Sequence, residues 1–377
     1  MTSTALPRRG FLAASAIGLT SIAGGTVSAA PPTTTPKTAA KTTTTTAKKT
    51  GPRFRPTGRA GLGGVAIGNG FMKVTNDEQA TATLQAAWDA GVRTFDTSPF
   101  YGFGLSERRF GHVLHQHKRD DYVLCTKVGR VFTATTGTLP KSLWAEPSPF
   151  RYRYDYSADG VLRSIEDSLN RLGVSRLDVV FVHDLSRDTK DLDFEPAFAE
   201  ATRGAFVALS KLRDEGVIKA WGLGVNTAEP ALRALDVADP DIFLLATQYS
   251  LIEHQASLTD TFPKIEARGA SVVVGSPLNA GFLAGRDRFN YGESIPADVK
   301  AKRAKLQAVA ATHKVDLRTA ALQFAAAPSV VSAIVPGART AEQVKENMAS
   351  MKTKIPAAFW QQLRADKLIA ETAPVPA

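Results

Sequence analysis

The segment VRTFDTSPFYG, residues 92–102, decides how the fold is interpreted. Its first five residues, 92–96, are rich in β-branched and aromatic side chains, which predicts a buried strand. A loop that contains proline and glycine follows this strand. Helical periodicity is present before the strand, over residues 77–90, and after it, up to about residue 115. This part of the chain therefore predicts strands that alternate with helices.

The same alternation continues along the rest of the chain. The expected strands are short and almost entirely Val, Ile or Leu, as in sheets covered on both faces. They lie at residues 61–68 (a strand or hairpin), 92–96, 122–127, 177–182, 218–224, 242–247, 271–274 and 330–335. The expected helices lie at residues 77–90, 106–115, 158–172, 201–215, 229–236, 257–268, 297–313 and 340–351, with Ser106 as a cap and Gly173 as a terminator.

This pattern predicts the α/β class and, within it, one (β/α)8 TIM barrel with extra helices. A doubly wound open sheet is the alternative. No Gly-x-Gly-x-x-Gly motif stands between the first strand and the first helix, and the Gly102-Phe103-Gly104 stretch lacks a third glycine. The barrel is therefore favoured, over residues 58–377.

The net charge of +10 invites a nucleic-acid or anionic-membrane interpretation, but its distribution argues against one. Residues 1–59 hold nine of the 46 basic residues and none of the 36 acidic ones, so the remainder is close to neutral. No nucleic-acid partner is expected for the barrel. The single cysteine, Cys125, excludes an intrachain disulfide and is expected to be buried in a strand.

The basic head, residues 1–57, is expected to consist of a signal peptide and a flexible linker. Residues 1–29 combine the pair Arg8-Arg9, a short apolar stretch and small residues before a cleavage site, and they resemble a twin-arginine signal peptide. An uncleaved anchor or a basic tail is the alternative. Residues 30–57 form a Thr/Pro/Lys-rich linker that is expected to be disordered. The twin-arginine export machinery is thus an expected partner, the location periplasmic or secreted, and no stable membrane span remains after cleavage.

Polar side chains stand at the ends of consecutive expected strands. Asp96 ends the second strand, with Tyr101 in its loop, Lys127 ends the third, and His183 follows the fourth. Taken singly, each residue can have a purely structural role, since Asp often caps helices and Lys at a strand end usually extends its charged group to water. Together they would face one mouth of a barrel, where barrel enzymes hold their active sites.

The motifs around these residues resemble the aldo-keto reductase superfamily. They are FDTSPFYG at residues 95–102, TKVG at 126–129 and VHD at 182–184, with SERRFG at 106–111 and PGAR at 336–339 in support. The resemblance extends from about residue 58 onward. Two further stretches, AWDAGVRTFD and DYSADG, are similar to the branch that includes L-fucose and D-threo-aldose 1-dehydrogenases and pyridoxal 4-dehydrogenase.

The resemblance implies a catalytic role for four residues. Tyr101 would be the general acid in reduction and the general base in oxidation. The ammonium group of Lys127 would favour the phenolate, Asp96 would hold that ammonium, and His183 would donate a hydrogen bond to the substrate oxygen. No metal is expected.

The resemblance also assigns a nicotinamide cofactor, NADP with NAD possible. The residues that match the family's cofactor contacts are Asn226, Gln248, Ser276, Pro277, Leu278, Gly337, Arg339, Gln343 and Asn347. Arg339 could pair bidentately with a 2′-phosphate, although a solvated helix-start residue is the alternative. Gly275 lacks the aromatic ring that stacks on nicotinamide in many relatives.

Three functions follow from this interpretation. The first is an exported NADP-dependent oxidoreductase acting on an aldose or a small aldehyde or alcohol. The second is a cofactor-bound sensor or regulatory subunit of the same fold, with little turnover. The third is a polyanion-binding surface protein that uses its basic head. Substrate choice is expected from the aromatic-rich loop at residues 130–156, whose rings suit either sugar faces or the packing of the loop itself.

Overall fold

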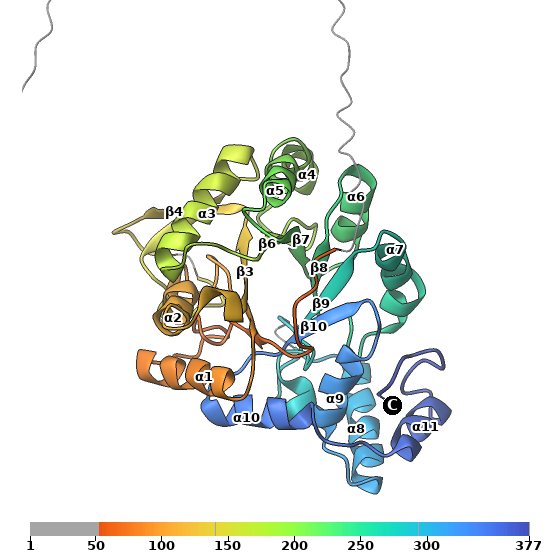
Figure 1. The fold of residues 1–377 in the computed structure, drawn as a ribbon. Helices are drawn as coiled ribbons and strands as arrows, with labels where there is room; N and C mark the ends of the chain where they lie inside the picture. Colours follow the sequence, from red (N-terminus) through yellow and green to blue (C-terminus); the bar gives the residue numbers. More distant parts are fainter. Residues whose placement is uncertain (1–52, 140, 293, 377) are drawn as a thin grey trace, which may run out of the picture. The chain divides into compact units, whose positions relative to one another are not determined.

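The computed structural model describes residues 53–376, except residues 140 and 293. The predicted signal peptide and most of the predicted linker lie outside the described residues. In the described part, eight parallel strands form a barrel in the order β1-β2-β3-β6-β7-β8-β9-β10, surrounded by helices (Figure 1). The predicted (β/α)8 barrel is confirmed, and the open sheet is excluded.

The barrel strands are β1 (Leu62–Gly63), β2 (Thr94–Asp96), β3 (Val123–Val128), β6 (Val179–His183), β7 (Ala220–Val225), β8 (Ile242–Ala246), β9 (Ser271–Gly275) and β10 (Val331–Val335). The α-helices are α1 (Asp77–Asp89), α2 (Leu105–Leu114), α3 (Ala158–Leu172), α4 (Phe194–Arg203), α5 (Ala205–Asp214), α6 (Glu229–Val237), α7 (Phe262–Ala267), α8 (Ala297–Thr312), α9 (Leu317–Ala326), α10 (Ala341–Ser350) and α11 (Ala357–Ala365). Short helical turns cover Arg119–Asp121, Ser257–Thr261 and Phe282–Ala284.

The barrel closes between its first and last strands. The amide of Gly61 donates to the carbonyl of Ile334 over 2.8 Å, and the amide of Gly63 donates to the carbonyl of Pro336 over 3.1 Å. Closure leaves no open edge in this sheet, so its backbone groups are paired around the ring.

Alternate residues of the strands fill the inside of the barrel. The inward cluster includes Val123 and Cys125 of β3 and Val179 and Phe181 of β6, all almost completely buried. Side chains along a strand alternate between its two faces, so the next inward positions on these strands are 127 and 183. The burial of Cys125 confirms the expectation for the single cysteine.

Local signals set the ends of two helices, and the stop at Gly173 is the one that the sequence predicts. The side chain of Asn76 accepts a hydrogen bond from the amide of Gln79 and caps α1, and Gly173 ends α3 with a left-handed φ of 63°. The expected cap at Ser106 is wrong. Helix α2 begins one residue earlier, after Gly104, and the buried Ser106 hydroxyl donates to the carbonyl of Gly64, so tertiary contacts use it instead.

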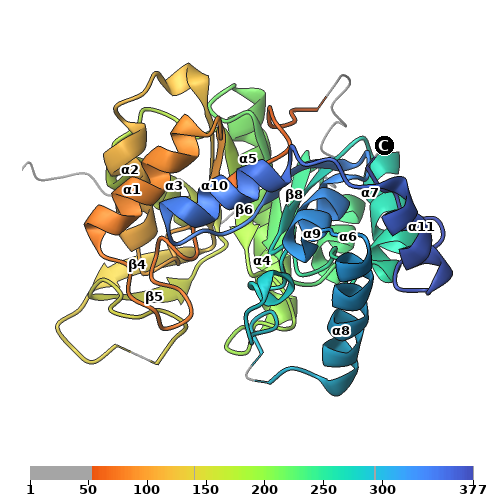
Figure 2. The same cartoon turned by 90° about the horizontal axis from the view of Figure 1, so that it is seen from below.

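Helices α9 and α11 were not among the expected helices, the strand expected at 61–68 is reduced to β1, and two further regions differ from the expected elements. The single helix expected at 201–215 is two helices, α4 and α5, divided at Gly204. A Cβ atom at this position would lie 2.7 Å from the carbonyl oxygen of Tyr156, so only glycine allows the close approach at this break. The loop expected at 130–156 contains an antiparallel hairpin, β4 (Arg130–Ala134) with β5 (Phe150–Tyr154). Figure 2 shows this hairpin projecting from one end of the barrel.

The end of the predicted linker is anchored on the barrel. The guanidinium of Arg53 is largely buried and pairs with the carboxylates of Asp239 and Asp241. Phe54 packs against the inward cluster, beneath the ammonium of Lys219. These residues were assigned to the disordered segment from local composition, but contacts with residues almost 190 positions away hold them in place.

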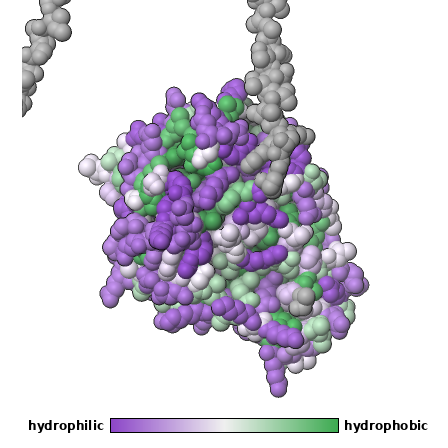
Figure 3. Space-filling model, viewed as in Figure 1, coloured by the Kyte–Doolittle hydropathy of each residue, from purple (hydrophilic) through white to green (hydrophobic). Residues whose placement is uncertain are grey.

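The face of the molecule in Figure 3 is mostly hydrophilic outside the grey atoms, with hydrophobic groups in small patches. This pattern fits helices that turn their apolar stripe inward and their polar face to solvent. Among the helices of the described residues, none combines the length and the apolar character needed to cross a membrane.

Candidate active site

Three of the expected catalytic residues are the last inward-facing residues of adjacent strands. Lys127 follows Val123 and Cys125 on β3, and His183 follows Val179 and Phe181 on β6. Asp96 ends β2, which pairs with β3. Alternation thus carries all three side chains into the barrel at the carboxyl ends of its strands.

Lys127 and Asp96 form a buried ion pair. The Lys127 Nζ donates to both carboxylate oxygens of Asp96, over 2.8 and 2.9 Å, and to the carbonyl oxygen of Thr97 over 2.8 Å. The same ammonium lies 4.6 Å from the centre of the Tyr101 ring. Burial raises the pKa of the Asp96 carboxyl, and the charge of Lys127 opposes this rise.

His183 lies on the other side of Tyr101. The two ring centres are 5.8 Å apart and the rings meet edge to face. The His183 Nδ1 is 3.2 Å from the Ser98 hydroxyl. Burial, and then the positive charges of Arg130 and Lys127, place the pKa of His183 well below its usual value. The imidazole is therefore neutral at physiological pH.

The Tyr101 phenol stays protonated in this structure. Burial raises its pKa well above the usual value, and the negative charges of Asp96 and Asp184 add to the rise. The expectation that the Lys127 ammonium favours the phenolate stays a prediction, and in this structure the lysine charge is paired with Asp96. A protonated phenol is ready to act as an acid, and acting as a base requires it to lose a proton.

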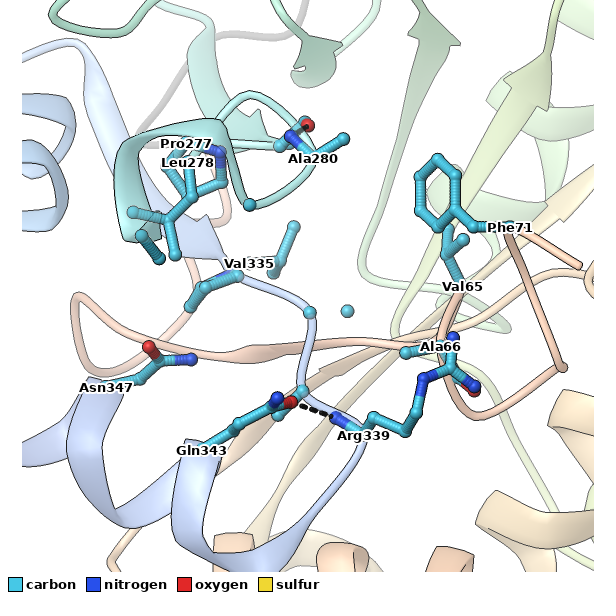
Figure 4. Close-up of a pocket in the computed structure, with 18 of the residues that line it drawn as sticks. Val65, Ala66, Phe71, Pro277, Leu278, Ala280, Val335, Arg339, Gln343 and Asn347 are labelled. Atoms are coloured by element: carbon cyan, nitrogen blue, oxygen red, sulfur yellow. Dashed lines mark hydrogen bonds between the residues drawn. The ribbon is translucent and has the colours of Figure 1, made fainter. Parts of the chain in front are cut away.

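A cavity of about 320 Å³ opens next to Tyr101 and Asp96, a size typical of ligand sites. Seven of the nine expected cofactor residues line it: Ser276, Pro277, Leu278, Gly337, Arg339, Gln343 and Asn347. Figure 4 shows Gln343 and Asn347 reaching toward the cavity from α10, while Pro277 and Leu278 lie on its opposite side. Asn226 and Gln248 are not in this lining. They contact one another, through a 2.6 Å hydrogen bond from the Gln248 amide to the carbonyl of Asn226.

The guanidinium of Arg339 is engaged by the loop after β1. It donates to the carbonyl oxygens of Lys73 (2.7 Å) and Gly70 (2.8 Å) and to the hydroxyl of Thr75 (2.6 Å). Figure 4 shows the side chain extended toward Ala66 of that loop. In this arrangement Arg339 ties the segment between β10 and α10 to the loop, and a pairing with phosphate requires it to exchange these bonds.

Positive charge is concentrated in the cavity. The residues that line it include Lys73, Arg286, Arg288 and Arg318 in addition to Arg339, against two acidic residues, Asp96 and Glu346. Burial lowers the pKa of Arg339, and the charges of Arg288 and Arg286 lower it further, which reports repulsion among like charges. An anionic ligand relieves this repulsion, so the lining fits the phosphates of a nicotinamide dinucleotide.

The aromatic residues of the 130–156 region pack together beside the expected catalytic residues. Phe132 and Trp144 form a buried cluster with Tyr101 and Phe103. The ring centres of Trp144 and Tyr101 are 5.5 Å apart. The rings therefore serve the packing of the loop and also border Tyr101, where a substrate would lie.

Arg130 is a residue at the site that the sequence interpretation did not single out. Its guanidinium is almost fully buried, 3.3 Å from the Nδ1 of His183 and 2.9 Å from the carboxylate of Asp184. Its position gives a signal that could have been used, because a cation three residues after Lys127 still lies at the carboxyl end of the third strand. Among the described residues, no group of three or more His, Cys, Asp or Glu side chains is placed to hold a metal ion.

The comparison with known protein families agrees with this geometry. The model of the aldo/keto reductase family matches residues 59–366. The chain belongs to the aldo/keto reductase family. The barrel that carries Tyr101 and the three residues around it is thus that of a family of oxidoreductases.

Two relatives of this aldo/keto reductase are similar over most of its length. Pyridoxal 4-dehydrogenase from Microbacterium luteolum is 37% identical over 337 residues, which cover 84% of this chain and 98% of the relative. D-threo-aldose 1-dehydrogenase from a Pseudomonas species is 35% identical over 319 residues, which cover 82% and 94%. The fold is similar to that of the holo form of an aldo-keto reductase from Bacillus halodurans, with a TM-score of 0.65, 24% identity and coverage of 86% and 97%.

Proposed function

We propose that this aldo/keto reductase is an exported, NADP-preferring enzyme that transfers a hydride between its cofactor and an aldose or a small aldehyde or alcohol. The observation that carries the proposal is the meeting of Asp96, Lys127, Tyr101 and His183 beside a cationic cavity. A sensor of the same fold does not need all four residues in this arrangement.

Each residue has a distinct task in the proposed reaction. When bound, the nicotinamide cofactor supplies or accepts the hydride. Tyr101 gives its phenolic proton to the carbonyl oxygen in reduction and takes a proton from the alcohol in oxidation. His183 donates a hydrogen bond to the same oxygen. Lys127, held by Asp96, keeps a positive charge beside the Tyr101 ring.

The substrate class is proposed from the names of the relatives and from the aromatic cluster. One relative is named for pyridoxal and the other for an aldose, and both are dehydrogenases. Phe100 lies next to His183 and Trp144 next to Tyr101, with the Tyr152 ring against Phe100. Rings of this kind can pack on the apolar face of a sugar or against an aromatic aldehyde.

The experiment is a spectrophotometric screen of the purified protein. A panel of aldoses and alcohols is offered with NADP⁺ and NAD⁺, and a panel of aldehydes with NADPH and NADH, with reduced nicotinamide followed by its absorbance. We expect turnover with at least one aldose or aldehyde. We also expect NADPH to bind about tenfold more tightly than NADH, because one charge-assisted contact contributes about 1.5–3 kcal/mol.

Different results would contradict different parts of the proposal. Tighter binding of NADH would refute the NADP preference and leave the hydride transfer intact. Tight nucleotide binding without turnover on the whole panel would favour the sensor. An Arg339→Met variant serves as a control for the expected role of this residue, since unchanged NADPH selectivity would show that other cations hold the phosphate.

We also propose export through the twin-arginine pathway, on the basis of Arg8 and Arg9 and the apolar stretch that follows them. The test expresses the full chain in a bacterium that has this pathway. The protein is expected in the periplasmic or extracellular fraction, shortened at its amino terminus. The double substitution Arg8→Lys and Arg9→Lys should retain it in the cytoplasm, whereas Lys48→Arg with Lys49→Arg should not. Equal export of both variants would overturn the proposal.

A further inference from the structure

Arg130 is a buried cation between the hairpin and the catalytic residues. It begins β4, and its guanidinium lies 4.0 Å from the centre of the Phe100 ring. One terminal nitrogen, Nη2, donates to Asp184 over 2.9 Å and to the Tyr154 hydroxyl over 3.2 Å. The other, Nη1, lies 3.3 Å from the Nδ1 of His183. These contacts leave the guanidinium in one orientation, aimed at the imidazole.

The contacts at His183 Nδ1 determine which ring nitrogen carries the hydrogen. A guanidinium has donors and no acceptor, so Nδ1 must be the acceptor of the hydrogen bond from Arg130. The Ser98 hydroxyl, 3.2 Å from Nδ1, accepts the amide hydrogen of Phe100, so its own hydrogen is available for Nδ1. With Nδ1 bare, a neutral imidazole holds its hydrogen on Nε2.

We propose that Arg130 is a positioning residue that keeps His183 neutral, with Nδ1 bare and the hydrogen on Nε2. The proposal rests on the proposed hydride-transfer function, in which the substrate oxygen accepts the hydrogen bond from this Nε2. His183 then acts as a hydrogen-bond donor, and Tyr101 remains the residue that exchanges the proton. None of the family-matched motifs assigns this role to Arg130.

The charges around His183 favour the neutral form. The groups that face it are Arg130 from β4, Lys127 from β3, Tyr101 from the loop after β2, and its neighbour Asp184. Burial and the two cations lower the pKa of His183. Asp184 has the opposite sign, but its Oδ2 is paired with Arg130 and its Oδ1 lies at 3.5 Å from Nε2, a long contact.

A second layer of side chains fixes Arg130 itself. The Tyr154 hydroxyl, which accepts from Arg130, donates to Asp191 over 2.8 Å. The buried Tyr156 hydroxyl donates to the carbonyl oxygen of His183 over 3.0 Å and fixes the backbone of the histidine. The hairpin and the end of β6 are thus joined through Arg130, so the imidazole and the guanidinium keep their relative orientation.

The test begins with the unaltered protein, labelled with ¹⁵N at its histidines. The His183 signals are identified by their loss in a His183→Gln variant. We expect an unprotonated Nδ1 and a protonated Nε2 from pH 5 to pH 8. A hydrogen on Nδ1, or a doubly protonated ring at pH 6, would overturn the proposal without the need for any Arg130 variant.

The second part compares Arg130→Met and Arg130→Lys with the control Arg153→Met, which removes an exposed arginine of the same hairpin. In Arg130→Met the pKa of His183 should rise but stay below its usual value, because burial, the larger cause of its depression, remains. A ring that is protonated at Nδ1 loses the hydrogen bond that it accepts from Ser98 and with it its fixed orientation, so kcat should be lower at pH 5.5 than at pH 7.5. The unaltered protein, Arg130→Lys and Arg153→Met should show no such loss.

The remaining outcomes distinguish a failure of the positioning role of Arg130 from a failure of the proposed function. An Arg130→Met variant whose His183 titration and pH profile are unchanged contradicts the positioning role. A rise of KM at all pH values with unchanged His183 signals means that Arg130 contacts the substrate directly, which also contradicts it. If the unaltered protein has no turnover but its His183 signals shift as expected in Arg130→Met, the proposed function fails and the control of the histidine by Arg130 stands.

Discussion

Replacement of Tyr101 by phenylalanine is expected to lower kcat by about 10²–10⁴-fold, the usual contribution of a general acid or base. The reason is the loss of the one phenol that lies against both Lys127 and His183 in the described structure. Its hydroxyl makes no hydrogen bond within the described residues, so the substitution leaves no polar partner unsatisfied. The ring contact with Trp144 remains, and folding should be unchanged.

The measurement pairs steady-state kinetics with cofactor binding. The dissociation constant of the reduced cofactor should stay within about twofold of the original value, since the phenol is not a charged ligand of the phosphates. The matched control is Tyr122→Phe, which removes a buried hydroxyl without a hydrogen-bond partner in the described structure, at the start of β3 and away from the mouth. Full activity in Tyr101→Phe would eliminate Tyr101 as the proton-transfer residue.

The sequence locates the barrel and three residues of the candidate site for a simple physical reason. Short strands with covered faces are visible as apolar runs, and the ends of parallel strands meet at one mouth. Asp96, Lys127 and His183 could therefore be grouped before any contact was known. Tyr101 was grouped with them because its loop begins at Asp96.

The parts that the sequence could not predict depend on contacts between distant residues. Arg53 looks like linker until its pairing with Asp239 and Asp241 is known. The break at Gly204 depends on the carbonyl of Tyr156. Arg339 matches a phosphate-binding position, but the carbonyl groups of another loop compete for its guanidinium.

The hairpin is an exception, because a local signal for it was present. Residues 150–154 alternate aromatic side chains with arginine, a period of two that is typical of a strand with two different faces. In the structure this alternation puts the rings on one side and exposes Arg151 and Arg153 on the other. Recognition of this strand would also have drawn attention to its partner, which starts at Arg130.

Replacement of Lys127 by methionine is expected to destabilise the protein by about 3–5 kcal/mol at pH 7, because it leaves the Asp96 carboxylate buried without its cation. The side chain of Lys127 is 1% exposed and that of Asp96 is 5% exposed, so water cannot replace the lost partner. Urea unfolding at equilibrium measures the effect. The control is Lys211→Met, which breaks an exposed i,i+4 pair with Glu215 and should leave the unfolding midpoint unchanged.

The pH dependence of this loss follows from the Asp96 carboxyl. Its pKa is already raised in the folded protein, and removal of Lys127, which opposes the rise, raises it further. A carboxyl with a higher pKa in the folded state than in the unfolded state binds more protons when the protein is folded. Its contribution to stability is therefore fully present below the unfolded-state pKa of about 4 and is lost as the pH rises. The difference in the free energy of unfolding between Lys127→Met and the unaltered protein should therefore become smaller as the pH is lowered from 7 to 4.

A double variant separates the stability of the ion pair from its role in the reaction. Lys127→Met combined with Asp96→Leu removes both charges and should recover most of the lost stability, because apolar residues of similar volume often replace a buried pair at little cost. The Thr97 carbonyl still loses its donor, so the recovery is incomplete. Turnover should remain low in the double variant, since no ammonium lies beside Tyr101. Recovery of both stability and turnover would show that the pair has no part in catalysis, whereas an unaltered stability of Lys127→Met at pH 7 would contradict the argument from burial.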